Sequence, residues 1–258
     1  MAKIVAFVNQ KGGVGKTTSA VNLAASVAAK GFRVLLVDID PQGNATSGLG
    51  VNKREVKNSS YDIIINAMPV ENIMIHTEFK NLWLVPSSMN LAGAELELVD
   101  MAHREAKLKN SLSLVKGIFD FIFLDCPPSL GLITLNGLCA ADTVLVPIQC
   151  EYYALEGLSQ LISTIRTVKR MYNPRIDMEG VLMTMFDNRL NLTHQVVEEL
   201  KKFFPQKVYS TVIPRNVKLS EAPSFGLPII YYDKKSKGAE AYDQLADEFI
   251  RKNGKEVE

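Results

Sequence analysis

Residues 11–18, Lys-Gly-Gly-Val-Gly-Lys-Thr-Thr, have the residue types and the spacing of a phosphate-binding loop. Glycine has no Cβ, so backbone N–H groups in such a loop can crowd around an anion. Lys16 supplies a mobile cation for the β- and γ-phosphates, and Thr17 supplies a hydroxyl for a metal ion. The pattern predicts a Walker A loop. The residues expected to bind the nucleotide here are Gly12, Gly13, Val14, Gly15, Lys16, Thr17 and Thr18.

The loop departs from the general Walker A pattern in one position. That pattern has glycine six residues before the lysine, where this chain has Gln10, and a second lysine, Lys11, follows directly. A phosphate loop already has its lysine in Lys16, so Lys11 needs an explanation of its own. The simple alternative is a solvated surface lysine beside a glycine turn. The two lysines together favour the "deviant" form of the Walker A loop.

Acidic residues follow two apolar segments that read as buried strands. Arg33–Asp38 ends in an acid with Asp40 just beyond it, and Phe119–Asp125 has the Walker B pattern, in which a carboxylate at a strand end reaches Mg²⁺. Ligands bind at the carboxyl ends of parallel strands. From the residues alone, either Asp38 or Asp40 could hold the water that attacks a γ-phosphate.

The elements that must position these groups alternate along the chain. A buried strand over Ile4–Val8, a helix from Thr17 and the Arg33–Asp38 strand form one βαβ unit. Further strands are expected at 82–86, 143–147, 180–185 and 207–213, and helices at 61–67, 94–116, 155–171, 192–204 and 238–252, with a loop over 42–50. We predict an α/β fold: a single-domain P-loop NTPase over residues 1–258, whose mostly parallel, twisted sheet has helices on both faces.

Composition narrows the function only slightly. The chain has 258 residues and a net charge of +1, so overall charge names no partner. Its three cysteines are widely spaced, which excludes a disulfide framework and favours a reducing compartment. The start of the chain runs directly into a strand, and no apolar run has the length of a membrane span. We therefore expect a cytoplasmic protein that does not bind a membrane.

One segment is strongly basic. Between residues 201 and 237, eight lysines and arginines stand against two acids. Such a run is often no more than a solvated face, and charge alone does not decide. If it binds nucleic acid, the contacts go to phosphates, which gives salt-sensitive and sequence-independent binding.

The motifs at residues 11–18, 37–49, 125–132, 147–157 and 213–223 together resemble the ParA/MinD class of ATPases, most nearly the chromosomal ParA proteins called Soj. The resemblance implies ATP and Mg²⁺ as cofactors. It gives the water-orienting role to Asp40 and metal-side roles to Thr17, Asp38 and Asp125. It implies that Lys11 reaches the ATP of a partner subunit across a two-fold axis, so that Lys11, Lys16 and Asp40 form the catalytic set.

The same resemblance predicts which residues contact the adenine base and DNA. It places Pro214 and Asn216 against adenine, and Arg189 and Lys218 against DNA. It implies an ATPase for chromosome or plasmid partitioning. An ATP-dependent sandwich homodimer would bind double-stranded DNA non-specifically on the nucleoid, and a ParB-like centromere-binding protein would release it by stimulating hydrolysis. The alternatives are a MinD-like membrane-cycling ATPase for positioning cell division, and an ATP-dependent amide- or lactam-forming enzyme on the same fold.

Overall fold

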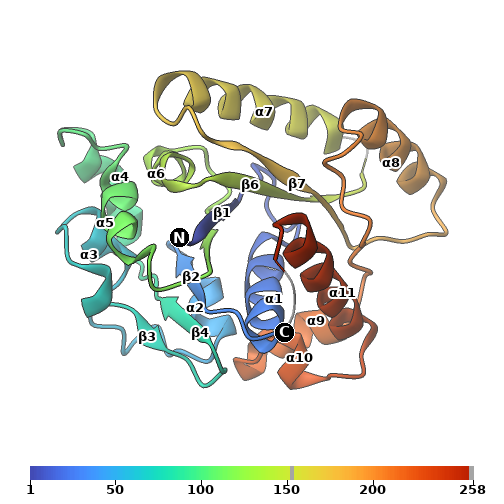
Figure 1. Ribbon diagram of the computed structural model, residues 1–258, viewed down its shortest axis with the longest axis horizontal. Coiled ribbons are helices and arrows are strands. Elements are labelled where there is room, and N and C mark those ends of the chain that lie inside the picture. Colours follow the sequence, from blue (N-terminus) through green and yellow to red (C-terminus); the bar gives the residue numbers. More distant parts are fainter. Residues whose placement is uncertain (152–153, 256–258) are drawn as a thin grey trace.

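The computed structural model describes residues 1–151 and 154–255, and in this part of the chain one sheet forms the centre of the molecule (Figure 1). Its seven strands lie in the order β3-β4-β2-β5-β1-β6-β7, and all are parallel except β3 at one edge. The strands are β1 (Lys3–Phe7), β2 (Val34–Asp38), β3 (Ile75–His76), β4 (Leu82–Val85), β5 (Phe121–Asp125), β6 (Thr143–Gln149) and β7 (Asp177–Thr184).

Helices cover both faces of this sheet, which confirms the predicted fold class (Figure 1). α1 and α11 pack together on one face, and α4 to α8 supply apolar side chains to the core on the other. The helices are α1 (Lys16–Ala29), α2 (Asn44–Gly48), α3 (Ser60–Ile64), α4 (Leu91–Leu98), α5 (Lys107–Val115), α6 (Leu132–Ala140), α7 (Ala154–Met171), α8 (Asn191–Phe203), α9 (Val217–Glu221), α10 (Ile229–Tyr232) and α11 (Lys237–Lys252), with 3₁₀ turns at Val70–Asn72 and Ala222–Phe225.

The central strands are buried on both sides because their sequences are apolar without alternation. Every residue of β2 and of β5 is buried. Phe123 of β5 stacks edge-on against Phe7 of β1 and Phe249 of α11, with ring centroids 5.5 and 5.4 Å apart. Burying each such side chain stabilises the fold by about 1.5–3 kcal/mol. This rigid centre holds the strand ends in fixed places.

Strand register brings the predicted chemical groups to one edge. Phe7 is the partner of Asp125 between β1 and β5, and Asp38 is the partner of Asp125 between β2 and β5. The loop that follows β1 therefore begins directly beside two carboxylates. None of the helices in residues 1–151 and 154–255 has both the length and the apolar character needed to cross a membrane.

The structure differs from expectation in the predicted loop over 42–50, which contains the short helix α2. Gly43, in the left-handed conformation with φ of 60°, begins this helix. The side chain of Asp38 accepts a hydrogen bond from the Thr46 N–H within it, at 2.8 Å. A buried carboxylate at the strand end thus holds a segment whose glycine and asparagine content is typical of a loop.

The strand predicted over 207–213 was wrong. This segment does run beside β7, with parallel bridges from Val208 to Val181 and from Pro214 to Phe186, but no continuous strand forms. The N–H groups of Ser210 and Thr211 donate to the carboxylate of Glu248 on α11, both at 2.8 Å. Because those donors are used by a side chain, the segment cannot continue the backbone ladder in between.

Candidate nucleotide site

The loop between β1 and α1 is shaped by glycine and anchored on both sides. Gly13 and Gly15 have φ of 75° and 81°, the left-handed region that favours glycine. The Asn9 side chain donates to the Pro147 carbonyl at 2.8 Å, and Thr184 donates to the Val14 carbonyl at 2.8 Å. The loop is therefore anchored to both β6 and β7, and within the described residues Gly12 and Gly13 have open space beside their Cα atoms.

Lys16 is the first residue of α1 and is only 7% exposed. Its ammonium donates to the carbonyl of Lys11 at 3.1 Å. Burial lowers the pKa of Lys16, while the negative charges of Asp125 and Asp40 act in the opposite direction. Lys16 is thus a buried cation beside two acids, at the helix end whose free N–H groups and dipole favour an anion.

Asp125 is fully buried, and within the described residues neither of its carboxylate oxygens has a hydrogen-bond partner. Burial raises the pKa of this carboxyl well above its ordinary value; the charge of Asp38 adds to the effect, and the nearby Thr17 hydroxyl opposes it. A buried carboxylate without a donor is costly unless a cation accompanies it. The residues present therefore fit a divalent cation next to Asp125 and Thr17.

No group of three or more histidine, cysteine or acidic side chains in the described chain forms a complete metal site. Magnesium in nucleotide enzymes does not require such a group. Mg²⁺ there is held by one or two protein groups, several waters and the substrate phosphates, rather than by an all-protein cage.

Asp38 differs from Asp125 in its surroundings. It accepts hydrogen bonds from the N–H and hydroxyl of Thr46, at 2.8 and 2.7 Å, and from the N–H of Asp40 at 3.1 Å. Burial raises the pKa of Asp38 to about 6, although the Thr46 hydrogen bonds oppose the shift. Asp40 is 8% exposed, and within the part of the chain that the structure describes its carboxylate accepts only from the Gln42 N–H, at 2.9 Å. Asp38 is therefore held tightly by the protein, whereas Asp40 retains acceptor capacity.

The backbone carbonyl of Lys11 accepts a hydrogen bond from Lys16 inside the loop, but the Lys11 side chain lies at the surface. Its side chain is 48% exposed and makes an ion pair with Glu151, which follows β6. The two lysines of the loop thus have opposite environments, one buried among acids and one at the surface.

The predicted adenine residues reach the same loop. A cavity of about 250 Å³ lies beside Gly15 and Thr18 and is also lined by Pro214 and Asn216. The Asn216 side chain begins α9 by accepting from the Lys218 N–H, at 2.8 Å. The cavity also includes Thr184 and Tyr242, which the sequence analysis missed. In the sequence, Thr184 stands out only as a polar residue at the end of an apolar strand, and Tyr242 only as a tyrosine on the apolar side of a helix.

Arg189 and Lys218 are both exposed and lie on neighbouring segments, because residues 186 and 214 form a bridge. Arg189 donates two hydrogen bonds from its guanidinium to Asp187, at 2.9 and 2.7 Å. Lys218 is ion-paired with Glu221 at 2.8 Å. Each predicted DNA contact therefore has an acidic partner within its own chain.

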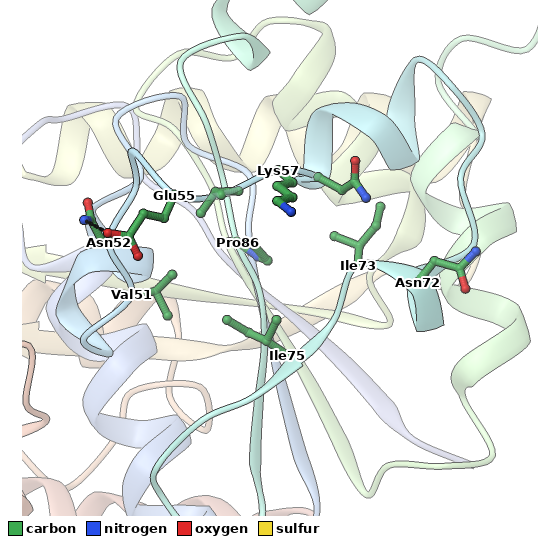
Figure 2. Close-up of a pocket in the computed structure, with 10 residues that line it drawn as sticks. Val51, Asn52, Glu55, Lys57, Asn72, Ile73, Ile75 and Pro86 are labelled. Carbon is green, nitrogen blue, oxygen red and sulfur yellow. Dashed lines mark hydrogen bonds between the residues drawn. The ribbon is translucent and has the colours of Figure 1, made fainter.

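A second hollow, of about 260 Å³, lies away from these groups, between the segment after α2 and the strand β3 (Figure 2). Apolar Ile73 and Ile75 share its wall with Glu55, which accepts a hydrogen bond from Asn52 at 2.7 Å. Lys57 also lines this hollow, but no glycine of the described chain does, so its wall lacks the glycine-rich backbone of a phosphate loop.

Comparisons with known proteins agree with this geometry. A family model described as an AAA domain matches residues 2–178. The sporulation initiation inhibitor protein Soj of Bacillus subtilis is 58% identical, over 98% of this chain and all of the relative. The chromosome partitioning protein ParA of Myxococcus xanthus is 53% identical, over 98% of this chain and 89% of the relative. The chain belongs to the Soj/ParA family.

Solved structures extend the family likeness. A cobyrinic acid a,c-diamide synthase from Mycobacterium smegmatis, with bound ADP and magnesium, superposes with a TM-score of 0.86 at 37% identity, covering 100% of this chain and 98% of that one. A plasmid partition protein from Borrelia burgdorferi bound to AMPPNP has a TM-score of 0.83 at 25% identity, covering 98% and 100%. The Soj/ParA family resemblance inferred from the motifs is confirmed, and the P-loop fold with it.

Proposed function

We propose that this member of the Soj/ParA family is a partitioning ATPase that binds ATP and Mg²⁺, and that residues 1–258 act as one deviant Walker A ATPase domain. The observation that carries the proposal is the contrast between the two loop lysines. Lys16 is buried beside Asp125 and Asp40, where it suits a phosphate bound within this chain. Lys11 is exposed, where it suits a phosphate bound to another chain.

The loop supplies the substrate cradle. Backbone N–H groups over residues 12–18 point at the phosphates of ATP, and the start of α1 adds its positive dipole end. Lys16 bridges the β- and γ-phosphates. Pro214 and Asn216, which line the adjoining cavity, contact the adenine.

Asp125, Thr17 and Asp38 form the metal side of the site. When bound, Mg²⁺ neutralises charge that develops on the phosphates during transfer. Asp125 has two buried oxygens with acceptor capacity, so it serves the metal, through water or directly. Asp38 already accepts three hydrogen bonds, so its part is to hold Thr46 and Asp40 around the site.

Asp40 orients the attacking water. Phosphoryl transfer needs a water in line with the γ-phosphate, and catalysis here consists mainly of positioning and charge stabilisation. The Asp40 carboxylate lies near Lys16, where burial lowers the pKa of the lysine and the negative charge of Asp40 acts to raise it. This carboxylate can still accept a hydrogen bond from a water, because the Gln42 N–H occupies only part of it.

Lys11 makes the site cooperative between two chains. Reaching the phosphates of a partner subunit, it links ATP binding to dimerisation and stabilises transition-state charge in the manner of an arginine finger. Dimerisation in turn doubles the DNA-contacting groups Arg189 and Lys218. Each phosphate contact is weak alone, but two linked halves bind at high effective concentration.

The resulting cycle would run in the cytoplasm, on the nucleoid. The ATP-bound dimer binds DNA of any sequence, and a ParB-like partner stimulates hydrolysis and returns the dimer to monomers. The names of the relatives support this cycle, since several are chromosome partitioning proteins.

The deciding experiment measures ATP hydrolysis by the intact protein alone, with duplex DNA, and with DNA plus the candidate ParB-like protein. We expect slow basal turnover that rises when both are present, and ATP-dependent, salt-sensitive binding to two unrelated duplexes. Equal turnover under all conditions together with no DNA binding would favour the metabolic alternative, an amide-forming enzyme like the 37% identical synthase.

The membrane-cycling alternative needs a free amphipathic helix near the carboxyl end. The apolar residues Leu245, Phe249 and Ile250 of α11 are instead buried in the core. Pelleting with anionic liposomes in the presence of ATP tests this alternative directly, and we expect the protein to stay in the supernatant.

A further inference from the structure

A closed ring of hydrogen bonds lies directly behind Asp40. The Ser87 hydroxyl donates to the Asp40 carbonyl at 2.7 Å, and the Ser87 N–H donates to the Thr46 hydroxyl oxygen at 2.9 Å. That hydroxyl donates to Asp38 at 2.7 Å, and Asp38 accepts from the Asp40 N–H at 3.1 Å. The ring therefore returns to the residue where it began.

The ring connects three separate elements. Asp38 ends β2, Thr46 lies in α2, and Ser87 stands two residues beyond the end of β4. Asp38, Thr46 and Ser87 are each 0% exposed. Pro86, on the wall of the hollow in Figure 2, directly precedes Ser87. In such a dry setting each hydrogen bond is strong, and each partner left unpaired is costly.

The two bonds to Asp40 constrain its backbone on both sides. Its N–H is held by Asp38 and its carbonyl by Ser87, so the peptide units that flank its Cα are both fixed. The direction of the Asp40 Cα–Cβ bond, from which the carboxylate extends, follows from these two peptide planes. A hydrogen bond from Ser87, just beyond β4, thus helps to place a carboxylate that follows β2.

We propose that Ser87 and Thr46 are positioning residues for hydrolysis, which act by fixing the direction of the Asp40 carboxylate toward the attacking water. This inference rests on the proposed function, in which Asp40 orients that water. Ser87 and Thr46 touch neither substrate nor water themselves. Without the ring, Asp40 keeps its charge but loses its fixed place, and a displacement of about 1 Å can slow a reaction about a hundredfold.

The test compares Ser87→Ala with Ser88→Ala. Ser88 is the adjacent serine, and its hydroxyl pairs with that of Ser59 at 2.9 Å, outside the ring. We expect Ser87→Ala to lower kcat about ten- to a hundredfold with the Kd for ATP changed by less than about threefold, and Ser88→Ala to leave both near wild type. Equal kcat values for Ser87→Ala and wild type overturn the proposal.

Thr46 offers a second pair of variants in case Ser87→Ala folds poorly. Thr46→Val keeps the side-chain shape but removes the hydroxyl, which both donates to Asp38 and accepts from Ser87. Thr46→Ser retains the hydroxyl. We expect Thr46→Val to lower kcat in the same way and Thr46→Ser to restore most of it. Equal losses in both variants contradict a role for the hydroxyl.

A double variant separates positioning from general support of the fold. If Ser87 acts through Asp40, Ser87→Ala should slow the wild type but should not slow Asp40→Ala further. A loss of the same size in both backgrounds shows a merely structural role and overturns the proposal. If the proposed function itself is wrong, the result is different: the wild-type protein then shows no ATP hydrolysis, and no variant can be compared with it.

Discussion

The ammonium of Lys11 is ion-paired with the carboxylate of Glu151, a residue 140 positions later in the chain. The pair joins the phosphate loop to the end of β6 within a single chain. If Lys11 must reach a partner's nucleotide, it has to leave Glu151 first. The pair then favours the monomer, and its strength sets part of the threshold for dimerisation.

Glu151→Gln should therefore favour the ATP-dependent dimer. Exposed ion pairs are worth up to about 1 kcal/mol, so we expect the dimer dissociation constant to fall by no more than about fivefold per pair released. Analytical ultracentrifugation with ATP and with ADP measures it. Glu156→Gln on α7, an exposed acid nearby in the chain, is the matched control. Weaker dimerisation of Glu151→Gln would mean that Glu151 supports the dimer instead.

Gly12→Val should block dimerisation without harming the monomer. Within the described residues a Cβ at Gly12 meets no atom within 4 Å, and Gly12 is not among the glycines with positive φ, so there is room for a side chain to begin there. A side chain there does obstruct a second subunit closing on the loop. We expect normal melting, retained ATP binding and monomers by size exclusion with ATP.

Gly117→Val is the control for that experiment. Gly117 is also exposed, and among the described residues a Cβ there likewise meets nothing within 4 Å, but Gly117 follows α5 and not the phosphate loop. It should dimerise like the wild type. If Gly12→Val dimerises equally well, the proposed sandwich arrangement through this loop is wrong.

Lys16→Ala should abolish ATP binding because it removes the buried cation that the phosphates would contact. Calorimetric titration with ATP and Mg²⁺ should show no saturable heat, while Lys11→Ala, the other lysine of the same loop, should bind ATP as a monomer. Normal affinity in Lys16→Ala would overturn the assignment of the phosphate loop.

Asp40→Ala and Asp38→Ala should separate two carboxylates that the sequence pattern leaves equivalent. Asp40→Ala should still bind ATP and dimerise but hydrolyse far more slowly, since the acceptor for water is lost while the phosphate loop is unchanged; the other bond lost is the one from the Gln42 N–H. Asp38→Ala removes the acceptor of three buried hydrogen bonds, and each donor left unpaired costs about 1–3 kcal/mol of folding stability. Melting curves and single-turnover hydrolysis distinguish the two. If Asp38→Ala is stable and hydrolyses slowly, Asp38 orients the water instead of Asp40.

The sequence predicted what depends on local pattern. Uninterrupted apolar runs gave the central strands, and the glycine spacing gave the loop between β1 and α1. It could not predict contacts made by distant side chains. Glu248 takes the N–H groups that a strand at 207–213 needed, and Ser87 joins the site only because β4 lies beside β2. Thr184 reaches the loop in the same way, from a strand 170 positions away.

The last prediction concerns the acid that accompanies a proposed DNA contact. Asp187 holds the guanidinium of Arg189 in two hydrogen bonds, and the same residue lies close enough to Arg215 to be influenced by its charge. Asp187 is therefore a counter-charge within the basic surface. Replacing it with asparagine should make the surface more positive and strengthen DNA binding by a few-fold, with a steeper dependence on salt. Arg189→Ala should weaken DNA binding and make its dependence on salt less steep.

The effect of Asp187→Asn should not vary with pH between 6 and 8. Hydrogen bonds from Arg189 lower the pKa of Asp187 to about 2, so the carboxylate is ionised throughout this range. A depressed pKa means that the pairing is fully present above the ordinary pKa of the acid and is lost only as pH falls through about 2. Glu199→Gln, which frees Lys202 on α8 from its acidic partner, is the control. The measurement is a salt titration of duplex binding with ATP at both pH values. A gain for Asp187→Asn that disappears at pH 8, or an equal gain for Glu199→Gln, would show that general charge rather than the Arg189 pair governs DNA binding.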